Sequence, residues 1–196
     1  MRKIRILLWV LVALAIVGVG LLLLRQPQTD ITPAPATMTR VDFGGPFTLT
    51  AADGQPFPSS RLAGKPHAIF FGFTHCPDVC PTTLARMVRL RQQLGENFEI
   101  VFVTVDPERD GPAEVGKYAE LFNAPITGLT GSPAQIEQVK KQYGIFSQKV
   151  PDQNGGYSVD HTSTVLLFDG AGEFVSTISP EEQDSVALDK LKRITA

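Results

Sequence analysis

The chain of 196 residues contains two cysteines, Cys76 and Cys80, both in the segment FGFTHCPDVCP. If one helical turn joins them, their Cα atoms are about 6 Å apart, inside the range that a disulfide accepts. The same spacing lets two thiolates bind one metal ion. The residue types and their spacing therefore predict a redox pair or a metal site.

The surroundings of the cysteines bear on their role. A structural disulfide is the alternative that an exported protein allows, but a link closing so short a loop removes little entropy from the unfolded chain. The pair follows an apolar run and precedes a predicted helix. Amide groups at a helix start stabilise a thiolate, which predicts a lowered cysteine pKa. Redox or metal chemistry is the better interpretation.

Three histidines, His67, His75 and His161, could complete a metal site. Thiolates are soft ligands that suit reduced copper, zinc or an iron–sulfur cluster. A cluster requires four cysteines and a structural zinc ion four ligands, which this sequence does not obviously supply; two sulfurs and one imidazole suffice for copper(I). We expect His67 to be exposed or to cap a strand, and the side chain of His75 to point away from Cys76. Spacing alone does not place His161, a loop residue, near the cysteines.

Hydrophobic periodicity and turn signals predict the elements that must position these residues. The predicted strands are residues 67–73, 99–105, 164–168 and 174–178, with hairpin turns at residues 53–54 and 169–170. The predicted helices are residues 82–94, residues 112–122, one opening at Ser132 and ending at Gly144, and a last one capped by residues 179–182. This order predicts an α/β fold, a three-layer domain with a mixed central sheet.

An uncharged apolar run occupies residues 6–24 and is long enough to cross about 30 Å of hydrocarbon as a helix. A cleaved signal peptide would be shorter and followed closely by a small-residue site, so we expect an uncleaved transmembrane anchor. Three basic residues precede it, which places residues 1–5 in the cytoplasm. Residues 25–39 are a Pro-rich tether, and residues 40–196 are the folded domain. A bacterial inner membrane with the domain in the periplasm fits this pattern, and an organellar membrane is the alternative.

The charge of the chain after the apolar run excludes one class of partner. Residues 26–196 carry 14 basic and 20 acidic side chains. Nucleic-acid binding depends on clustered Lys and Arg that neutralise phosphates. We therefore expect no nucleic-acid partner.

Acidic residues lie close to the candidate site in the sequence. The segment Asp106 to Asp110 (DPERD) follows a predicted strand, where sites of open α/β sheets gather. One interpretation is a charged turn in which Asp110 caps the next helix, and the other is support of the site or partner docking. Asp78 and Asp160 could likewise orient ligands or contact a partner.

Four segments resemble motifs of the Sco/SenC family of copper-binding cytochrome oxidase assembly proteins: GFTHCPDVCPT (72–82), VDPERD (105–110), GLTG (128–131) and VDHT (159–162). They occur in the right order over roughly residues 41–194, and the first is highly specific. The resemblance implies a thioredoxin-like fold, an N-terminal membrane anchor and one copper ion held by Cys76, Cys80 and His161. It also implies delivery of copper to the dinuclear copper site of the oxidase, or reduction of the cysteines of that site.

The leading function is a membrane-anchored copper chaperone. Its expected partners are the copper-site subunit of cytochrome c oxidase, a periplasmic copper donor or thiol reductant, and the inner membrane through residues 6–24. The first alternative is a thiol-disulfide oxidoreductase with Cys76 and Cys80 as its catalytic pair, although general disulfide catalysts have C-x-x-C. A peroxidase-like enzyme would need an activating arginine, and the sequence has none between Phe70 and Thr83. A copper or redox sensor is a further alternative.

Overall fold

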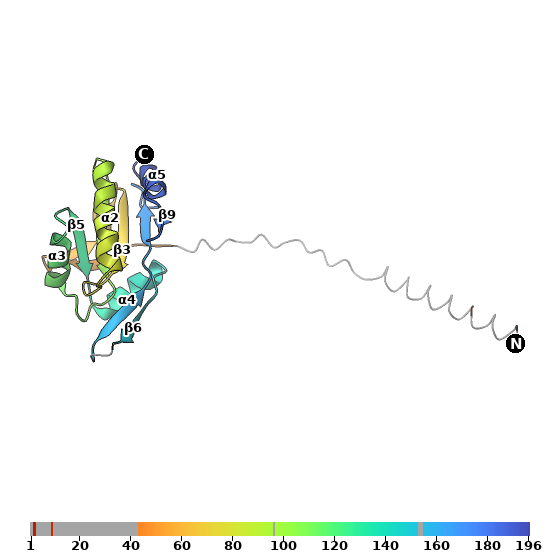
Figure 1. Ribbon diagram of the computed structural model, residues 1–196, viewed down its shortest axis with the longest axis horizontal. Helices are drawn as coiled ribbons and strands as arrows, with labels where there is room; N and C mark the ends of the chain where they lie inside the picture. Colours follow the sequence, from red (N-terminus) through yellow and green to blue (C-terminus); the bar gives the residue numbers. More distant parts are fainter. Residues whose placement is uncertain (1, 3–8, 10–42, 96, 153–154) are drawn as a thin grey trace. The chain divides into compact units, whose positions relative to one another are not determined.

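The computed structural model describes residues 2, 9, 43–95, 97–152 and 155–196 (Figure 1). The chain divides into two units, residues 1–39 and residues 40–196. Apart from Trp9, the predicted anchor at residues 6–24 lies outside the described residues, as does the tether at residues 25–39. None of the helices in the described parts of the chain combines the length and apolar character that membrane crossing requires.

The second unit is built on a seven-stranded sheet with the order β2-β1-β5-β4-β3-β8-β9. Its strands are β1 (Thr48–Ala51), β2 (Pro56–Pro58), β3 (His67–Gly72), β4 (Glu99–Thr104), β5 (Ile126–Thr130), β8 (Val165–Phe168) and β9 (Phe174–Ile178). Two further strands, β6 (Ser147–Pro151) and β7 (Tyr157–His161), form a separate sheet. The helices are a 3-10 helix η1 (Ser59–Leu62), α2 (Val79–Gln93), α3 (Pro112–Glu120), α4 (Pro133–Gln142) and α5 (Asp184–Ile194).

The seven-stranded sheet is mixed, as predicted. Strands β3, β4 and β5 are parallel, and α2 and α3 connect them. Strands β1 and β8 pair antiparallel with β5 and β3, and β2 and β9 extend these edges. All six residues of β3 are buried, which requires cover on both faces of the sheet. The prediction of a three-layer α/β domain with a mixed central sheet is thus confirmed.

Helices α2 and α5 lie side by side (Figure 1), and one buried arginine joins them. The Nε atom of Arg86 in α2 donates to Asp184 in α5 at 2.7 Å. Its Nη1 atom donates to the backbone oxygens of Ser179 and Pro180. Residues 179–182 were predicted to cap the last helix, and this is wrong: the cap residue of α5 is Gln183. Arg86 instead holds residues 179–182 as the loop that leads into the helix.

The other helix boundaries agree more closely with the sequence. Ser132 and Gln135 form the predicted capping box at the start of α4, and α3 covers most of its predicted range. Helix α2 begins at Val79, three residues before the predicted start at residue 82. Cys80 therefore lies in the first turn of α2, while Cys76 lies in the loop before it.

Strand β5 was not predicted, and a glycine explains why. Its sequence, ITGLT, is not the continuous apolar run that marks β3 and β4. A Cβ atom on Gly128 would lie 2.7 Å from the backbone oxygen of Val115 in α3. Glycine is needed because α3 packs that closely on the strand, so the packing itself weakens the sequence signal.

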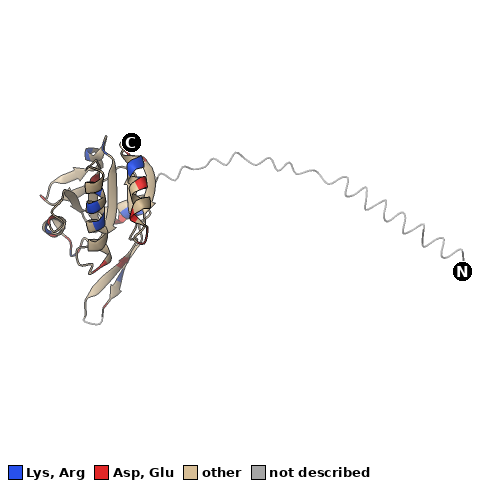
Figure 2. Cartoon of the chain, turned by 45° about the horizontal axis from the view of Figure 1, so that its top comes forward, with Lys and Arg blue, Asp and Glu red and all other residues tan. Residues whose placement is uncertain are grey.

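The hairpin of β6 and β7 was also not predicted. It projects from the body of the domain (Figure 2), and four of the five residues of β6 are exposed. Pairs such as Ser147 with His161 and Pro151 with Tyr157 define its antiparallel register. A strand that buries so little shows no hydrophobic alternation, and that is why the sequence pattern gave no strand here.

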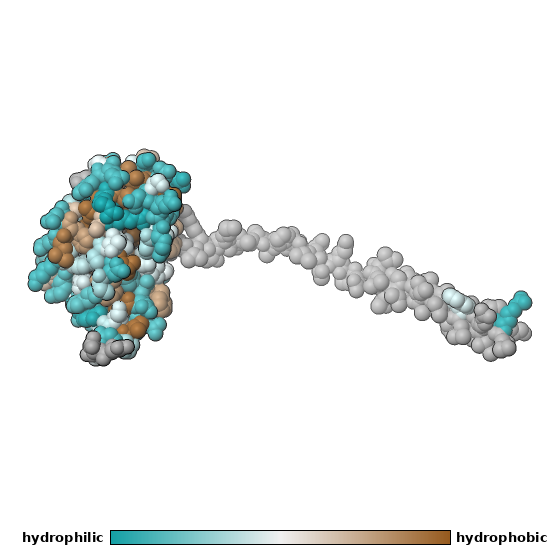
Figure 3. All heavy atoms as spheres, in the orientation of Figure 1, coloured by the Kyte–Doolittle hydropathy of each residue, from teal (hydrophilic) through white to brown (hydrophobic). Residues whose placement is uncertain are grey.

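The surface of the domain mixes polar and apolar side chains. On the face that Figure 3 shows, apolar residues lie among hydrophilic ones, as on most folded domains. Two of the exposed large apolar residues belong to the hairpin region: Phe146, which is 58% exposed, and Val150 in β6. The hairpin therefore presents apolar as well as charged side chains to its surroundings.

Candidate metal centre

Cys76, Cys80 and His161 lie together in the structure. One potential ligand atom from each residue lies within 4.8 Å of the other two. The Sγ atom of Cys80 is 3.3 Å from the Nε2 atom of His161, and both cysteines are free thiols. The structure thus brings together the three residues that the family resemblance singled out.

The two cysteines differ in their surroundings. Cys80 has no exposed surface, whereas Cys76 is partly exposed. The backbone amide of Cys80, in the first turn of α2, donates to the Sγ atom of Cys76 at 3.4 Å. Burial raises the pKa of the Cys80 thiol, because a thiolate without nearby water is disfavoured. The expectation of a pKa lowered by the helix start is therefore wrong for Cys80.

The imidazole of His161 is oriented for ligation. Its Nδ1 atom lies 2.9 Å from the backbone oxygen of Thr162. A carbonyl oxygen only accepts, so Nδ1 carries the proton and Nε2 presents a lone pair toward Cys80. The rings of Phe70 and Phe73 meet the imidazole nearly edge-on, at centroid distances of 6.1 and 5.8 Å. Burial lowers the pKa of His161, which favours the neutral form that binds metals.

Asp110 supports the loop that carries Cys76. It is fully buried, and its carboxylate accepts hydrogen bonds from the Thr74 amide at 2.8 Å, the Thr74 hydroxyl at 2.6 Å and the Thr104 hydroxyl at 2.7 Å. The interpretation that Asp110 caps the next helix is wrong, since the cap residue of α3 is Gly111. Asp110 instead ties the end of β4 to the start of the cysteine loop.

The other two histidines lie outside the cluster of Cys76, Cys80 and His161. The side chain of His75 is 53% exposed and lies 3.4 Å from Asp110. His67, at the start of β3, was expected to be exposed or capping, and this is wrong because only 6% of it is exposed. Its ring stacks on Phe168 with centroids 5.0 Å apart and donates from Nδ1 to the Lys65 oxygen.

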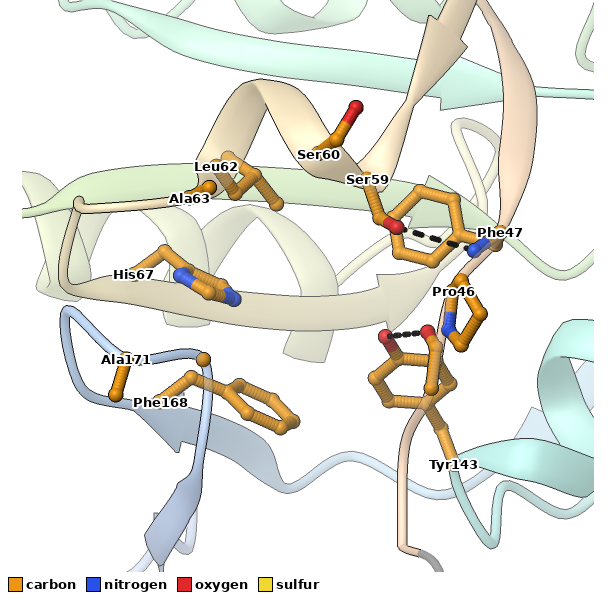
Figure 4. A pocket seen from close by; sticks show the side chains of 12 residues that line it. Pro46, Phe47, Ser59, Ser60, Leu62, Ala63, His67, Tyr143, Phe168 and Ala171 are labelled. Carbon is orange, nitrogen blue, oxygen red and sulfur yellow. Dashed lines mark hydrogen bonds between the residues drawn. The ribbon is translucent and has the colours of Figure 1, made fainter.

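His67 lines a cavity that is distinct from the cysteine loop (Figure 4). The volume of this cavity is about 360 Å³, and Phe47, Tyr143 and Phe168 are among its lining residues. Two hydrogen bonds fix its wall, from the Tyr143 hydroxyl to the Gly45 oxygen and from the Phe47 amide to the Ser59 hydroxyl. Since β3 runs from His67 to Gly72 and the cysteines follow, this cavity lies at the opposite end of the strand.

A second cavity adjoins the cluster and gives access to it. Its volume is about 390 Å³, and its walls are the cysteine loop on one side and β7 on the other. Cys76 and His161 line it, together with the carboxylates of Asp78 and Asp160. Cys76 and His161 are therefore the members of the cluster that border this cavity, and Asp78 and Asp160 lie beside them.

The donor set of the cluster suits a soft, singly or doubly charged transition metal. Two sulfurs and one imidazole nitrogen match the preferences of copper, and three protein ligands leave a position open for a ligand from another molecule. The thiols must lose their protons when a metal binds. The same two sulfurs can instead be oxidised to a disulfide, so the arrangement serves metal binding or thiol exchange.

The sequence of the chain matches that of known proteins. A sequence model described as SCO1/SenC matches residues 35–196. The Arabidopsis thaliana protein SCO1 homolog 1, mitochondrial, is 38% identical over 136 residues, which are 67% of this chain and 41% of that protein. This chain thus spans less than half the length of that relative.

Two solved structures extend the comparison. The structure of Bradyrhizobium japonicum ScoI with copper bound is 40% identical with a TM-score of 0.69, over 78% of this chain and 99% of that one. BsSco, described with a disulfide switch and as a member of the Sco family of cytochrome c oxidase assembly proteins, is 26% identical with a TM-score of 0.60, over 77% and 92% of the two chains. The α/β fold described above is thioredoxin-like, and the chain belongs to the SCO1/SenC family.

Proposed function

We propose that this protein is a copper chaperone that binds one copper ion through Cys76, Cys80 and His161 and delivers it to the dinuclear copper site of cytochrome c oxidase. The observation that carries the proposal is the convergence of the three ligand atoms within 4.8 Å. The copper-bound relative of 40% identity and the assembly role named for BsSco support it.

The geometry suits transfer as well as binding. Cys80 is buried, while Cys76 and His161 face the cavity of about 390 Å³. A thiolate or imidazole of an acceptor can therefore enter beside Cys76 and replace the ligands of this chain one at a time. Asp78 and Asp160 at the cavity favour a cation or a basic partner there. In this function copper is the cargo, and the residues of the chain hold it, keep it accessible and release it.

A copper titration tests the proposal. The full-length chain, reduced and purified in detergent, is titrated with Cu(I) against a chelator of known affinity and with Cu(II) by absorption spectroscopy. We expect one copper per chain, loss of binding in Cys76→Ala and Cys80→Ala, and weaker binding in His161→Ala. The matched control is His75→Ala, which removes an imidazole next to Cys76 that lies outside the cluster. Equal binding by His161→Ala and wild type would contradict the three-ligand site.

The second candidate function is reduction of the cysteines of the oxidase copper site. The sulfur of Cys76, the more exposed of the two cysteines, would attack an acceptor disulfide and form a mixed disulfide, releasing one acceptor thiol. Cys80 would then attack the sulfur of Cys76, releasing the second thiol and leaving a Cys76–Cys80 disulfide, which an external thiol reductant must reduce. The nearness of the two sulfur atoms and the disulfide switch named for BsSco favour this candidate.

Exchange with a model disulfide separates the two functions. Thiol exchange needs both sulfurs but no metal ligand, so His161→Ala should still exchange disulfides if the chain acts as a reductase, with at most the change in rate that follows from losing the imidazole 3.3 Å from the Cys80 sulfur. Copper delivery instead depends on His161. A chain that exchanges disulfides rapidly and does not bind copper at sub-micromolar concentration would make the redox function the principal one.

We further propose that residues 6–24 anchor the chain in a bacterial inner membrane, with residues 1–5 in the cytoplasm, residues 25–39 as a tether and residues 40–196 as the copper-binding domain in the periplasm. The apolar run, its basic flank and the division of the chain after residue 39 support this arrangement. Protease added to spheroplasts should digest residues 40–196 without lysis. Protection of that domain until the membrane is broken would contradict the proposed orientation.

A further inference from the structure

The strand that carries His161 depends on contacts outside its own hairpin. Within the described part of the chain, strands β6 and β7 pair only with each other, and an isolated two-stranded hairpin is marginally stable in water. Alternate side chains of a strand share a face, so Tyr157, Val159 and His161 face the same way. Val159 is buried, while Ser158 and Asp160 are exposed. This face of β7 is therefore the one that packs on the domain.

Tyr157, at the far end of that face from His161, is held at three points by the turn after β4. Its backbone oxygen accepts from Nη1 of Arg109 at 2.9 Å, and its hydroxyl donates to Oδ1 of Asp106 at 3.0 Å. The guanidinium of Arg109 lies 3.8 Å from the centroid of the Tyr157 ring. These contacts fix the backbone, the ring and the hydroxyl of one residue together.

The turn that makes these contacts is itself fixed. Asp106 is 1% exposed, and its second carboxylate oxygen accepts from Nε of Arg109 at 2.5 Å. The backbone oxygen of Asp106 also accepts from the amides of Arg109 and Asp110. A planar guanidinium that makes several bonds in set directions gives more geometric definition than an ammonium group would.

The same turn reaches the other half of the metal site. Asp110, one residue after Arg109, binds the amide and the hydroxyl of Thr74 at the start of the cysteine loop. The segment 106–110 therefore touches the cysteine loop at one end and the histidine strand at the other. One turn therefore contacts both parts of the chain that supply the ligand atoms.

We propose that Asp106, Arg109 and Tyr157 form a latch that holds β7, and with it the imidazole of His161, at ligating distance from Cys80. Arg109 and Tyr157 are positioning residues, because they act on the cluster through His161 and do not touch a ligand atom. The latch rests on the proposed function, since it assumes that His161 is a copper ligand.

A double-mutant cycle tests the latch in the full-length chain. The substitution Arg109→Lys keeps the positive charge but removes the planar guanidinium. We expect it to weaken Cu(I) binding about tenfold, which is the lower end of the effect that residues supporting metal ligands show. Tyr157→Phe removes only the hydroxyl contact and should have a smaller effect. In the His161→Ala background neither substitution should weaken binding further, because an absent imidazole cannot be misplaced.

Two controls separate positioning from general structure. Asp189→Asn removes only an exposed ion pair to Lys192 within α5, which contributes little and does not touch the latch, so copper binding should be unchanged. The Cu(II) spectrum should change in Arg109→Lys and in His161→Ala alike, because both substitutions alter the coordination of the metal, which a loss of stability alone would not do.

The outcomes are distinct for the two proposals. Weakening by Arg109→Lys that adds in full to that of His161→Ala would overturn the latch, and so would wild-type affinity and spectrum in Arg109→Lys. In either case the three-ligand site stands if His161→Ala alone weakens binding. If His161→Ala binds copper like wild type, the proposed site fails and the latch fails with it.

Discussion

Gly72 and Cys80 pack so closely that a Cβ atom on Gly72 would lie 2.9 Å from the Sγ atom of Cys80. The same atom would lie 3.0 Å from ring carbons of Phe70 and Phe102, all of which are buried. The last residue of β3 is therefore glycine because the buried sulfur occupies the space in which any other side chain would begin.

Gly72→Ala should displace the Cys80 sulfur and strain the core. We expect a loss of about 1–3 kcal/mol in the free energy of unfolding, as for other overpacked cores, and weaker copper binding. Urea unfolding and copper titration measure the two effects. Gly170→Ala is the matched control, because its new Cβ would meet only ordinary contacts at 3.6 Å or more; equal stability of the two variants would refute the close-packing argument.

Asp110→Asn should loosen the cysteine loop. An amide nitrogen in place of one carboxylate oxygen cannot accept from Thr74 or Thr104, so a buried donor loses its partner. We expect a loss of about 1–3 kcal/mol in the free energy of unfolding, measured by urea denaturation. Asp53→Asn is the control, since Asp53 accepts one hydrogen bond in an exposed turn. A stability change no larger than that of the control would show that Asp110 is not needed in the loop.

Alkylation should distinguish the two thiols. Cys76 is partly exposed, while Cys80 is fully buried with a raised pKa, and each unit of pKa rise lowers the thiolate fraction about tenfold. Iodoacetamide should therefore label Cys80→Ala, which retains Cys76, far faster than Cys76→Ala, as followed by mass spectrometry at pH 7.5. The difference should vanish in urea. Similar rates in the folded chains would mean that Cys80 is accessible in solution.

The stability of the apo protein should fall in mild acid because of His67. Burial lowers the pKa of His67 below its ordinary value of 6.5. As the pH falls through 6.5, the unfolded chain takes up a proton that the folded chain resists, so the free energy of unfolding decreases until the folded-state pKa is reached. His67→Gln should show a shallower decrease between pH 7.5 and 5.5 in urea unfolding. Parallel curves for the two proteins would exclude His67 as a source of the acid sensitivity.

The sequence predicted those elements whose burial follows a simple pattern. Strand β3 is a continuous apolar run because both its faces are covered, and α4 carries its own start signal at Ser132. Strand β6 is mostly exposed and β5 contains Gly128 at a close contact with α3. Neither strand shows the periodicity that identifies a strand, because contacts with other parts of the chain determine which residues it contains.

The candidate site was predictable only in part. The spacing of Cys76 and Cys80 indicated sulfur chemistry directly, but His161 joins them across 81 residues, and only the family resemblance pointed to it. The buried role of Asp110 depends on Thr74, 36 residues away. Its place in the DPERD segment was the one available signal, because no local pattern distinguishes a carboxylate that binds a distant loop from one that caps a helix.

The origin of the cluster from two parts of the chain has a consequence for biosynthesis. Ribosomes make the thiols first, and the imidazole follows 81 residues later on β7. Until that strand pairs with β6, a nascent chain offers the two sulfurs without the imidazole of His161, and any ion captured early lacks that ligand. A chain that terminates within the hairpin before residue 161 keeps both thiols but lacks the imidazole of His161. Full metal affinity therefore requires that translation has passed residue 161.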